Sequence, residues 1–137
     1  MRPQLQYPFT YPRKYLMMQI VNRNMFIVKP KQPYVDWINA QSDQETPVTL
    51  SYFRRDCHTF LIPEVLGDDE VYEYIQVFKL EIFAFELNSW SRDPMFWPKR
   101  RTPAMFDEWF DLEFHSMIIG MEKTPLYKES LYKKCLG

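Results

Sequence analysis

The chain has 137 residues, of which 46% are hydrophobic and 18% aromatic, so it can build one folded core and is not a disordered chain. Its 17 basic and 18 acidic residues give a formal net charge of −1, which argues against nucleic acid or an anionic membrane as a partner. No apolar run approaches the ~20 residues that span a membrane. Cys57 and Cys135 have neither metal-binding nor disulfide-framework spacing. We therefore expect both thiols to be reduced, which indicates a cytoplasmic protein.

The N-terminal part of the chain predicts an arm, a strand and a helix. Residues 1–18 combine tyrosines and prolines without a period, which is typical of an extended or disordered arm. A single domain should then occupy residues 19–137. Within it, the apolar run at residues 25–28 predicts a first strand. Pro33 suits the first turn of a helix that should end near Ala40.

The longest predicted element is a helix that follows a second strand at residues 57–63. No glycine or proline interrupts residues 69–90, and Asp68 and Asp69 offer side-chain oxygens for an N-cap. We therefore predict one helix over residues 69–90, about 33 Å long at ~1.5 Å per residue.

This long helix carries two apolar stripes. At ~100° per residue, the two stripes lie on nearly opposite faces of the helix. A helix of this kind must be covered twice, once by its own sheet and once by another part of the chain or by another subunit. The first stripe predicts a core face, and the second is our candidate for a subunit interface. The first comprises Val71, Tyr74, Ile75, Phe78, Ile82 and Phe85, and the second Tyr72, Leu80, Phe83, Leu87 and Trp90.

The C-terminal third predicts a loop, a short helix, a strand and a last helix. Residues 91–102 contain two prolines and no usable period, so they should form a structured loop. Thr102 and Pro103 are a favourable N-cap and first-turn pair for a helix. Alternating apolar residues at 112–119 predict a third strand, which we expect at the centre of the sheet. Residues 126–135 predict a short basic helix, as a candidate lid for the second stripe.

The order of these elements predicts an α+β fold, with a small, mostly antiparallel sheet of three or four strands packed on one side by helices. Four stretches carry a further indication: FIVKPKQPYVDWIN, FLIPEVLGDDE, ELNSW and WPKRRTPAMFDEWFDLEFHSMI. Over roughly residues 23–122 they resemble a group of small bacterial proteins of unknown function. The resemblance implies a bacterial cytosolic origin, and it assigns no chemistry and no functional residue.

A cluster of basic and aromatic residues surrounds the predicted loop. Three consecutive basic residues lie just before Pro103, where the free N–H groups and the dipole of the predicted helix favour an anion. The cluster could bind a phosphate, a carboxylate or a single-stranded base. Alternatively, its arginines pair with the acidic residues that follow or only solvate the loop. The candidate residues are Arg92, Trp97, Lys99, Arg100 and Arg101.

Two further groups of residues carry side chains that could bind a metal or react, but their spacing matches no known motif. Asp107 and Asp111 lie four residues apart, on one face of the predicted helix, and together with His115 they could bind a divalent metal. Because this spacing matches no known ligand pattern, we expect no metal or other cofactor there. We expect His115 to be partly exposed, beside a carboxylate or a carbonyl. Cys57 and His58 should point to opposite faces of a strand, so His58 cannot serve as the base for Cys57.

Two functions remain open. The first is a non-catalytic protein-interaction module that forms a homodimer, or binds another protein, through the second stripe of the long helix. The second is a small enzyme or binding protein for an anionic ligand at the loop 90–103 and His115. We favour the first, because the sequence contains no catalytic motif and its surplus apolar face has to be covered.

Overall fold

The computed structural model describes residues 18–41, 46–64 and 67–131. Within these ranges the chain forms an α+β fold with one long helix, as predicted. Its strands form two small antiparallel sheets instead of the single sheet that we expected. The predicted arm at residues 1–18 lies outside the described residues, except for Met18. No helix in the described ranges combines the length and hydrophobicity needed to cross a lipid bilayer.

The three-stranded sheet has β2, Arg23–Pro30, at its centre. This strand pairs antiparallel with β3, His58–Pro63, on one side and with β4, Phe110–His115, on the other. Buried and half-buried residues alternate along β2, so one face of the sheet packs on the core. The expectation that the third predicted strand is central is therefore wrong, because β4 lies at an edge.

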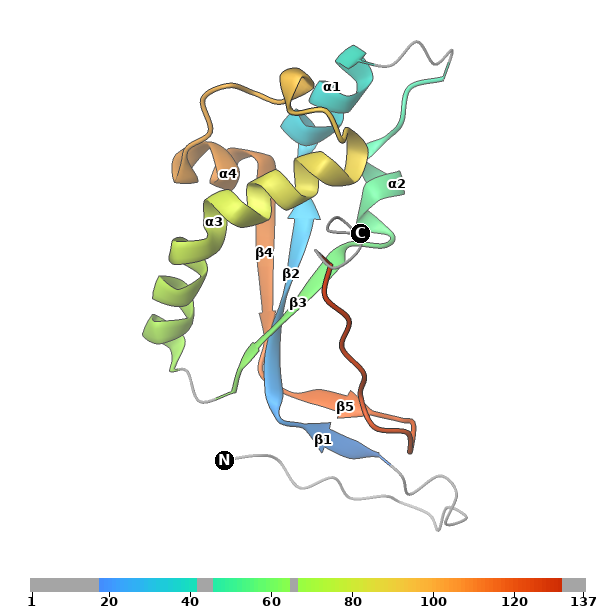
Figure 1. The fold of residues 1–137 in the computed structure, drawn as a ribbon, viewed down its shortest axis with the longest axis vertical. Helices are drawn as coiled ribbons and strands as arrows, with labels where there is room; N and C mark the ends of the chain where they lie inside the picture. The colour runs from blue at the N-terminus through green and yellow to red at the C-terminus, as the bar shows by residue number, and fades with distance from the viewer. Residues whose placement is uncertain (1–17, 42–45, 65–66, 132–137) are drawn as a thin grey trace.

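A second sheet contains only β1, Gln19–Val21, and β5, Ile118–Gly120. The sequence did not predict β1. It also predicted one strand at residues 112–119, whereas β4 ends at His115 and β5 begins at Ile118. Figure 1 shows that β1 and β5 lie at the end of the molecule opposite α1 and α4.

The long helix α3, Asp68–Trp90, begins one residue before its predicted start. Its N-cap is Gly67, which has no side-chain capping bond, so the prediction of an aspartate cap is wrong. Helix α4, Pro103–Trp109, begins as predicted: the Thr102 hydroxyl accepts a hydrogen bond from the Met105 amide at 3.1 Å.

The remaining helices lie near the end of the sheet where β2 stops. Helix α1, Gln32–Gln41, follows β2 and matches its prediction within one residue at each end. The five-residue helix α2, Leu50–Arg54, and the short 3₁₀ helix η2, Pro94–Phe96, were not predicted. Residues 121–131 contain no helix, so the predicted helix from residue 126 is wrong as far as the structure describes it.

The core lies between α3, the buried face of the sheet, and the helices α1 and α4 (Figure 1). Aromatic rings dominate it: the Phe83 ring centroid lies 5.9 Å from that of Phe106 and 5.7 Å from that of Phe110. Such edge-to-face contacts are favourable geometries for aromatic pairs. The core cluster comprises Phe26, Val28, Tyr34, Ile38, Ile62, Val71, Ile75, Ile82, Phe83, Leu87, Phe106 and Phe110.

Candidate functional site

Strands β1 and β5 form a projecting arm that continues the pairing of β2 with β4. Between the pairs Val21–Ile118 and Met25–His115, one strand has three residues, 22–24, and the other has two, 116–117. One extra residue on one strand is a β-bulge, which bends a ribbon and increases its twist. Figure 1 shows the result: β1 and β5 turn away from the direction of β2 and β4.

One face of this arm is apolar and exposed. Ile20 and Ile119 are direct cross-strand partners and therefore share a face. Their exposed fractions are 45% and 39%. Met121, which directly follows β5, is exposed as well. Val21 and Ile118, on the opposite face, are half-buried, so the exposed apolar surface belongs to the first face.

The exposed apolar surface continues into the segment that follows β5. This segment, residues 121–131, runs from the arm back along the side of β3 (Figure 1). It carries three more large apolar residues that are exposed. Exposed apolar residues that gather on one side of a molecule mark interaction sites. We call the combined surface the apolar strip: Ile20, Ile119, Met121, Leu126, Tyr127 and Leu131.

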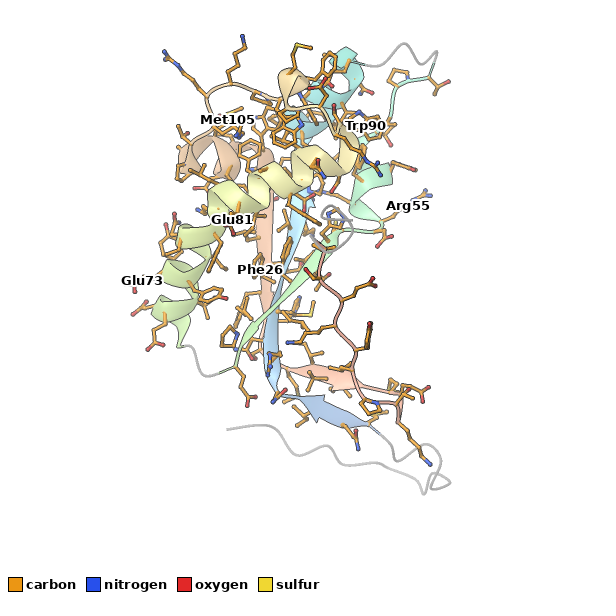
Figure 2. The ribbon with its side chains drawn as sticks, viewed as in Figure 1. Phe26, Arg55, Glu73, Glu81, Trp90 and Met105 are labelled. Atoms are coloured by element: carbon orange, nitrogen blue, oxygen red, sulfur yellow. The ribbon has the colours of Figure 1, made fainter. Side chains whose placement is uncertain are left out.

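The strip ends at an apolar groove of about 200 Å³ between β3 and α3. The floor of the groove contains Phe26, which is labelled on β2 in Figure 2, and Leu131 stands at its rim. Its walls include rings of the first stripe of α3, which was predicted to be a core face. Of these, Tyr74, Phe78 and Phe85 are only half-buried, so this side of α3 is incompletely covered.

The predicted interface on α3 is wrong at two of its five residues. Phe83 and Leu87 are completely buried, because α4 and the start of β4 cover this side of the helix. Trp90 is half-buried at the end of α3, where Figure 2 labels it, and its ring packs edge-to-face on Phe53 of α2. The chain thus covers the C-terminal half of the second stripe itself. Only Tyr72 and Leu80, in the N-terminal half, are exposed.

Some residues of the predicted anion cluster are exposed, and others make contacts within the loop. Arg92, Lys99 and Arg100 are exposed. Arg101 is half-buried: its guanidinium lies 5.5 Å from the centroid of the Trp97 ring and donates to the Pro98 carbonyl at 2.9 Å. The Trp97 indole in turn donates to the Ser91 carbonyl at 2.7 Å. Arg101 and Trp97 therefore hold the loop together, and the anion site stays a prediction.

The three metal-ligand candidates lie in separate ion pairs. Asp107 pairs with Lys79 at 2.7 Å, and Asp111 with Arg54 at 2.9 Å. The prediction that the two aspartates share a helix face is wrong, because α4 ends at Trp109 and Asp111 belongs to β4. In the described ranges, no three acidic, histidine or cysteine side chains form a possible metal site.

His115 is exposed, and its Nε2 lies 2.9 Å from Oε2 of Glu113, which confirms the expected carboxylate partner. This hydrogen bond, followed by the charge of Lys29, holds the pKa of Glu113 below its usual value. Glu113 also lies 3.5 Å from the Lys29 ammonium. The pairs lie on the surface of the sheet, where such contacts contribute little to stability.

Sequence reasoning missed a polar pair between β3 and α3. Nδ1 of His58 lies 2.9 and 3.0 Å from the two carboxylate oxygens of Glu86. The carboxylate is only 4% exposed, whereas the imidazole is 47% exposed. The hydrogen bond to Glu86 raises the pKa of His58, although partial burial opposes the shift. The spacing could have revealed Glu86, because it lies four residues after Ile82 on the core face of α3.

Cys57 does not join this pair. Its thiol lies 3.6 and 3.7 Å from the backbone carbonyls of Phe53 and Arg54, while the His58 ring contacts Glu86. Burial raises the pKa of Cys57, which disfavours the reactive thiolate. A cysteine nucleophile activated by His58 is therefore not the chemistry of this region.

No known protein family, curated protein or solved structure matches this chain significantly. Its function must therefore be inferred from the surfaces and cavities described above.

Proposed function

We propose that this chain is a non-catalytic protein-interaction module that forms a homodimer through the apolar strip. The surface differs from the one expected on the long helix, because Phe83 and Leu87 belong to the core. We also propose a bacterial cytoplasmic setting, which rests on the sequence resemblance and on the cysteine spacing.

The observation that carries the proposal is the exposed apolar face of the arm. A two-stranded sheet alone is marginally stable in water and needs a helix or further strands over its apolar face. In the described ranges, the helices gather toward the other end of the molecule (Figure 1), while Ile20 and Ile119 remain exposed. Burial of a fully exposed side chain of this size contributes about 1.5–3 kcal/mol. Covering the 45% of Ile20 and the 39% of Ile119 that are exposed would contribute a corresponding part of this, so association would stabilise the arm.

A second copy of the chain is the partner that best fits this surface. Two copies related by a two-fold axis present the same strip to each other, so one apolar surface can cover the other. The formal charge of −1 adds little repulsion between them. A stable interface buries roughly 800 Å² on each partner, which is why we include the segment 121–131 and the groove beside Leu131 in the contact.

Light scattering coupled to gel filtration on the full chain tests the proposal. We expect the mass of a dimer, with dissociation on dilution. Replacing Ile20→Glu together with Ile119→Lys should give a folded monomer, because it removes the apolar face but keeps a favourable cross-strand pair within the arm. Circular dichroism should show that the helices are retained.

Leu80→Glu is the matched control, since Leu80 is also exposed but lies on α3 outside the strip. This variant should remain a dimer. Dissociation by Leu80→Glu, with no effect of the arm variant, would move the interface to the outer side of α3. A wild-type chain that is monomeric at every concentration would contradict self-association altogether.

A further inference from the structure

A cavity of about 190 Å³ lies where β2, β3, α1, α2 and the C-terminal half of α3 meet. Its lining combines two carboxylates, an imidazole and three aromatic rings. In another protein, an engineered apolar cavity of ~150 Å³ holds a benzene molecule, so this cavity has room for a compact organic group. The residues that matter here are Tyr34, Phe53, Asp56, His58, Glu86 and Trp90.

Glu86 is a nearly buried carboxylate with unused acceptor capacity. Its two oxygens share one N–H, that of His58 Nδ1. An ionised carboxylate can accept about four hydrogen bonds, and the described residues supply no other donor to it. A buried charge is costly unless it is paired, and half-exposed His58 is its one ionic partner in the described chain. The site is therefore suited to a further positive group.

The aromatic part of the lining is suited to the same kind of ligand. The rings of Tyr34 and Phe53 are T-shaped at 5.7 Å, and those of Phe53 and Trp90 are T-shaped at 5.9 Å. Aromatic faces attract cations, and quaternary ammonium ligands are recognised by cages of such rings. Asp56, which lines the cavity beside His58, adds a second negative charge. Three aromatic rings and two carboxylates in one cavity favour an organic cation over an anion.

We propose that this cavity binds a small quaternary ammonium group, with Glu86 as the counter-charge and Tyr34, Phe53 and Trp90 as the aromatic walls. The site is separate from the apolar strip, so it neither requires nor excludes the proposed dimer. It also differs from the predicted anion cluster in the sign of its ligand.

Protons should compete with the ligand. Glu86 on α3 and Asp56 before β3 both favour a protonated His58, while Lys29 on β2 and Arg54 on α2 are the cations that act on neighbouring Cys57. An ammonium group beside Glu86 disfavours the imidazolium form of His58 through like-charge repulsion. Binding should therefore strengthen as the pH rises through the titration of His58.

Choline and its neutral isostere 3,3-dimethylbutan-1-ol are the probes for an experiment on the full chain. The two have the same shape, but only choline is charged. We expect calorimetry to show that the wild type binds choline about tenfold more tightly than the alcohol, the order of magnitude of a cation–aromatic contribution. Glu86→Gln should remove that preference. Glu81→Gln, an exposed glutamate on the same helix, should keep it.

Two results would overturn the proposal. One is equal binding of choline and the alcohol by the wild type. The other is no binding of choline at any concentration up to its solubility limit. Neither result depends on a variant. If Glu86→Gln fails to fold, Trp90→Leu should still lower the preference for choline, because it removes one aromatic wall. An unchanged preference in Trp90→Leu would contradict the aromatic part of the proposal.

Discussion

His58 shows how a single side chain can link stability to pH. Its hydrogen bond to Glu86 raises its pKa above the ordinary value of 6.5. A group whose pKa is higher in the folded state stabilises the fold fully below its unfolded pKa, and this contribution disappears as the pH rises through the folded pKa. The contribution of His58 should therefore be largest on the acid side of its titration.

We predict that His58→Gln destabilises the chain more at about pH 6 than at about pH 9, because the variant lacks the proton that Glu86 favours. Chemical denaturation at both pH values measures the difference from the wild type. His115→Gln serves as the control, since the His115 pair with Glu113 is exposed. A stability difference that grows with pH would show that the imidazolium is not favoured in the folded chain.

Lys79 is a buried cation that pairs with the carboxylate of Asp107. Its side chain is nearly inaccessible, its Nζ lies 2.7 Å from Asp107, and the rings of Tyr72 and Phe106 lie within 6 Å, at 5.7 and 5.9 Å. Removing one partner of such a pair leaves an uncompensated charge, whereas an apolar residue of similar volume avoids that cost. We predict that Asp107→Asn costs about 1–3 kcal/mol and that Lys79→Met costs less. Denaturant unfolding of both variants tests which substitution costs more stability. Lys79→Met would cost more than Asp107→Asn if the ammonium group were well hydrated.

Two neighbouring arginines should differ in their contribution to stability. Arg100 is exposed, whereas Arg101 lies against the Trp97 ring and donates to Pro98. We predict that Arg100→Glu changes the free energy of unfolding by less than about 0.5 kcal/mol and that Arg101→Glu lowers it by about 1–2 kcal/mol, since a stacking contact and a hydrogen bond are lost. Thermal melting measures both. Addition of inorganic phosphate to the wild type and to Arg100→Glu tests the anion site separately.

At the scale of elements, the two halves of α3 have different surroundings. Phe83 lies in the core against α4, while Phe78 lines a groove and is half-buried. We predict that Phe83→Ala lowers the free energy of unfolding by about 3–5 kcal/mol, as for a buried aromatic residue, and that Phe78→Ala costs clearly less. Denaturant midpoints of the two variants provide the comparison. Equal costs would mean that the groove is closed in solution.

The sequence predicted most elements whose signals are local. The absence of helix breakers specifies the helix at residues 69–90, and the Thr102–Pro103 pair specifies the start of the next helix through capping. Both helices form there. The strand at residues 25–28 lies within β2. In contrast, β1 has only three residues and depends on pairing with β5, nearly a hundred residues later. Such long-range pairing leaves no local pattern to recognise.

The site residues were harder to predict because they depend on which element covers which face. Periodicity correctly gave α3 two apolar stripes, but it could not show that α4 would bury Phe83 and Leu87. Nor could it show that residues 126–131 would remain without a helix. The pairing of His58 with Glu86 joins a strand to a helix 28 residues later. Only the tertiary arrangement brings these two side chains together.

For the whole molecule, the arrangement separates a well-packed part from an exposed one. The aromatic core lies where α1, α3 and α4 meet the sheet, and the arm extends from the opposite end of β2 and β4 (Figure 1). Local opening is easiest where few apolar contacts hold the backbone. The arm should therefore be the least stable pair of strands in an isolated copy, and the pair that a second copy stabilises most.

Hydrogen exchange at two protein concentrations tests this difference within one molecule. A partner that binds only the closed arm stabilises it more as the concentration of free protein rises, and an isolated two-stranded sheet has little protection of its own. We predict that amides of Gln19–Val21 and Ile118–Gly120 exchange more slowly at high than at low concentration. The amides of Phe26 and Val28, which belong to the central strand and the core, should exchange at the same slow rate in both samples, because the core of one copy already protects them. The variant with Ile20→Glu and Ile119→Lys should lose the concentration dependence. Arm amides that are as strongly protected as those of β2 in the most dilute sample would show that the arm is stable in one copy, and the argument for a partner would fail.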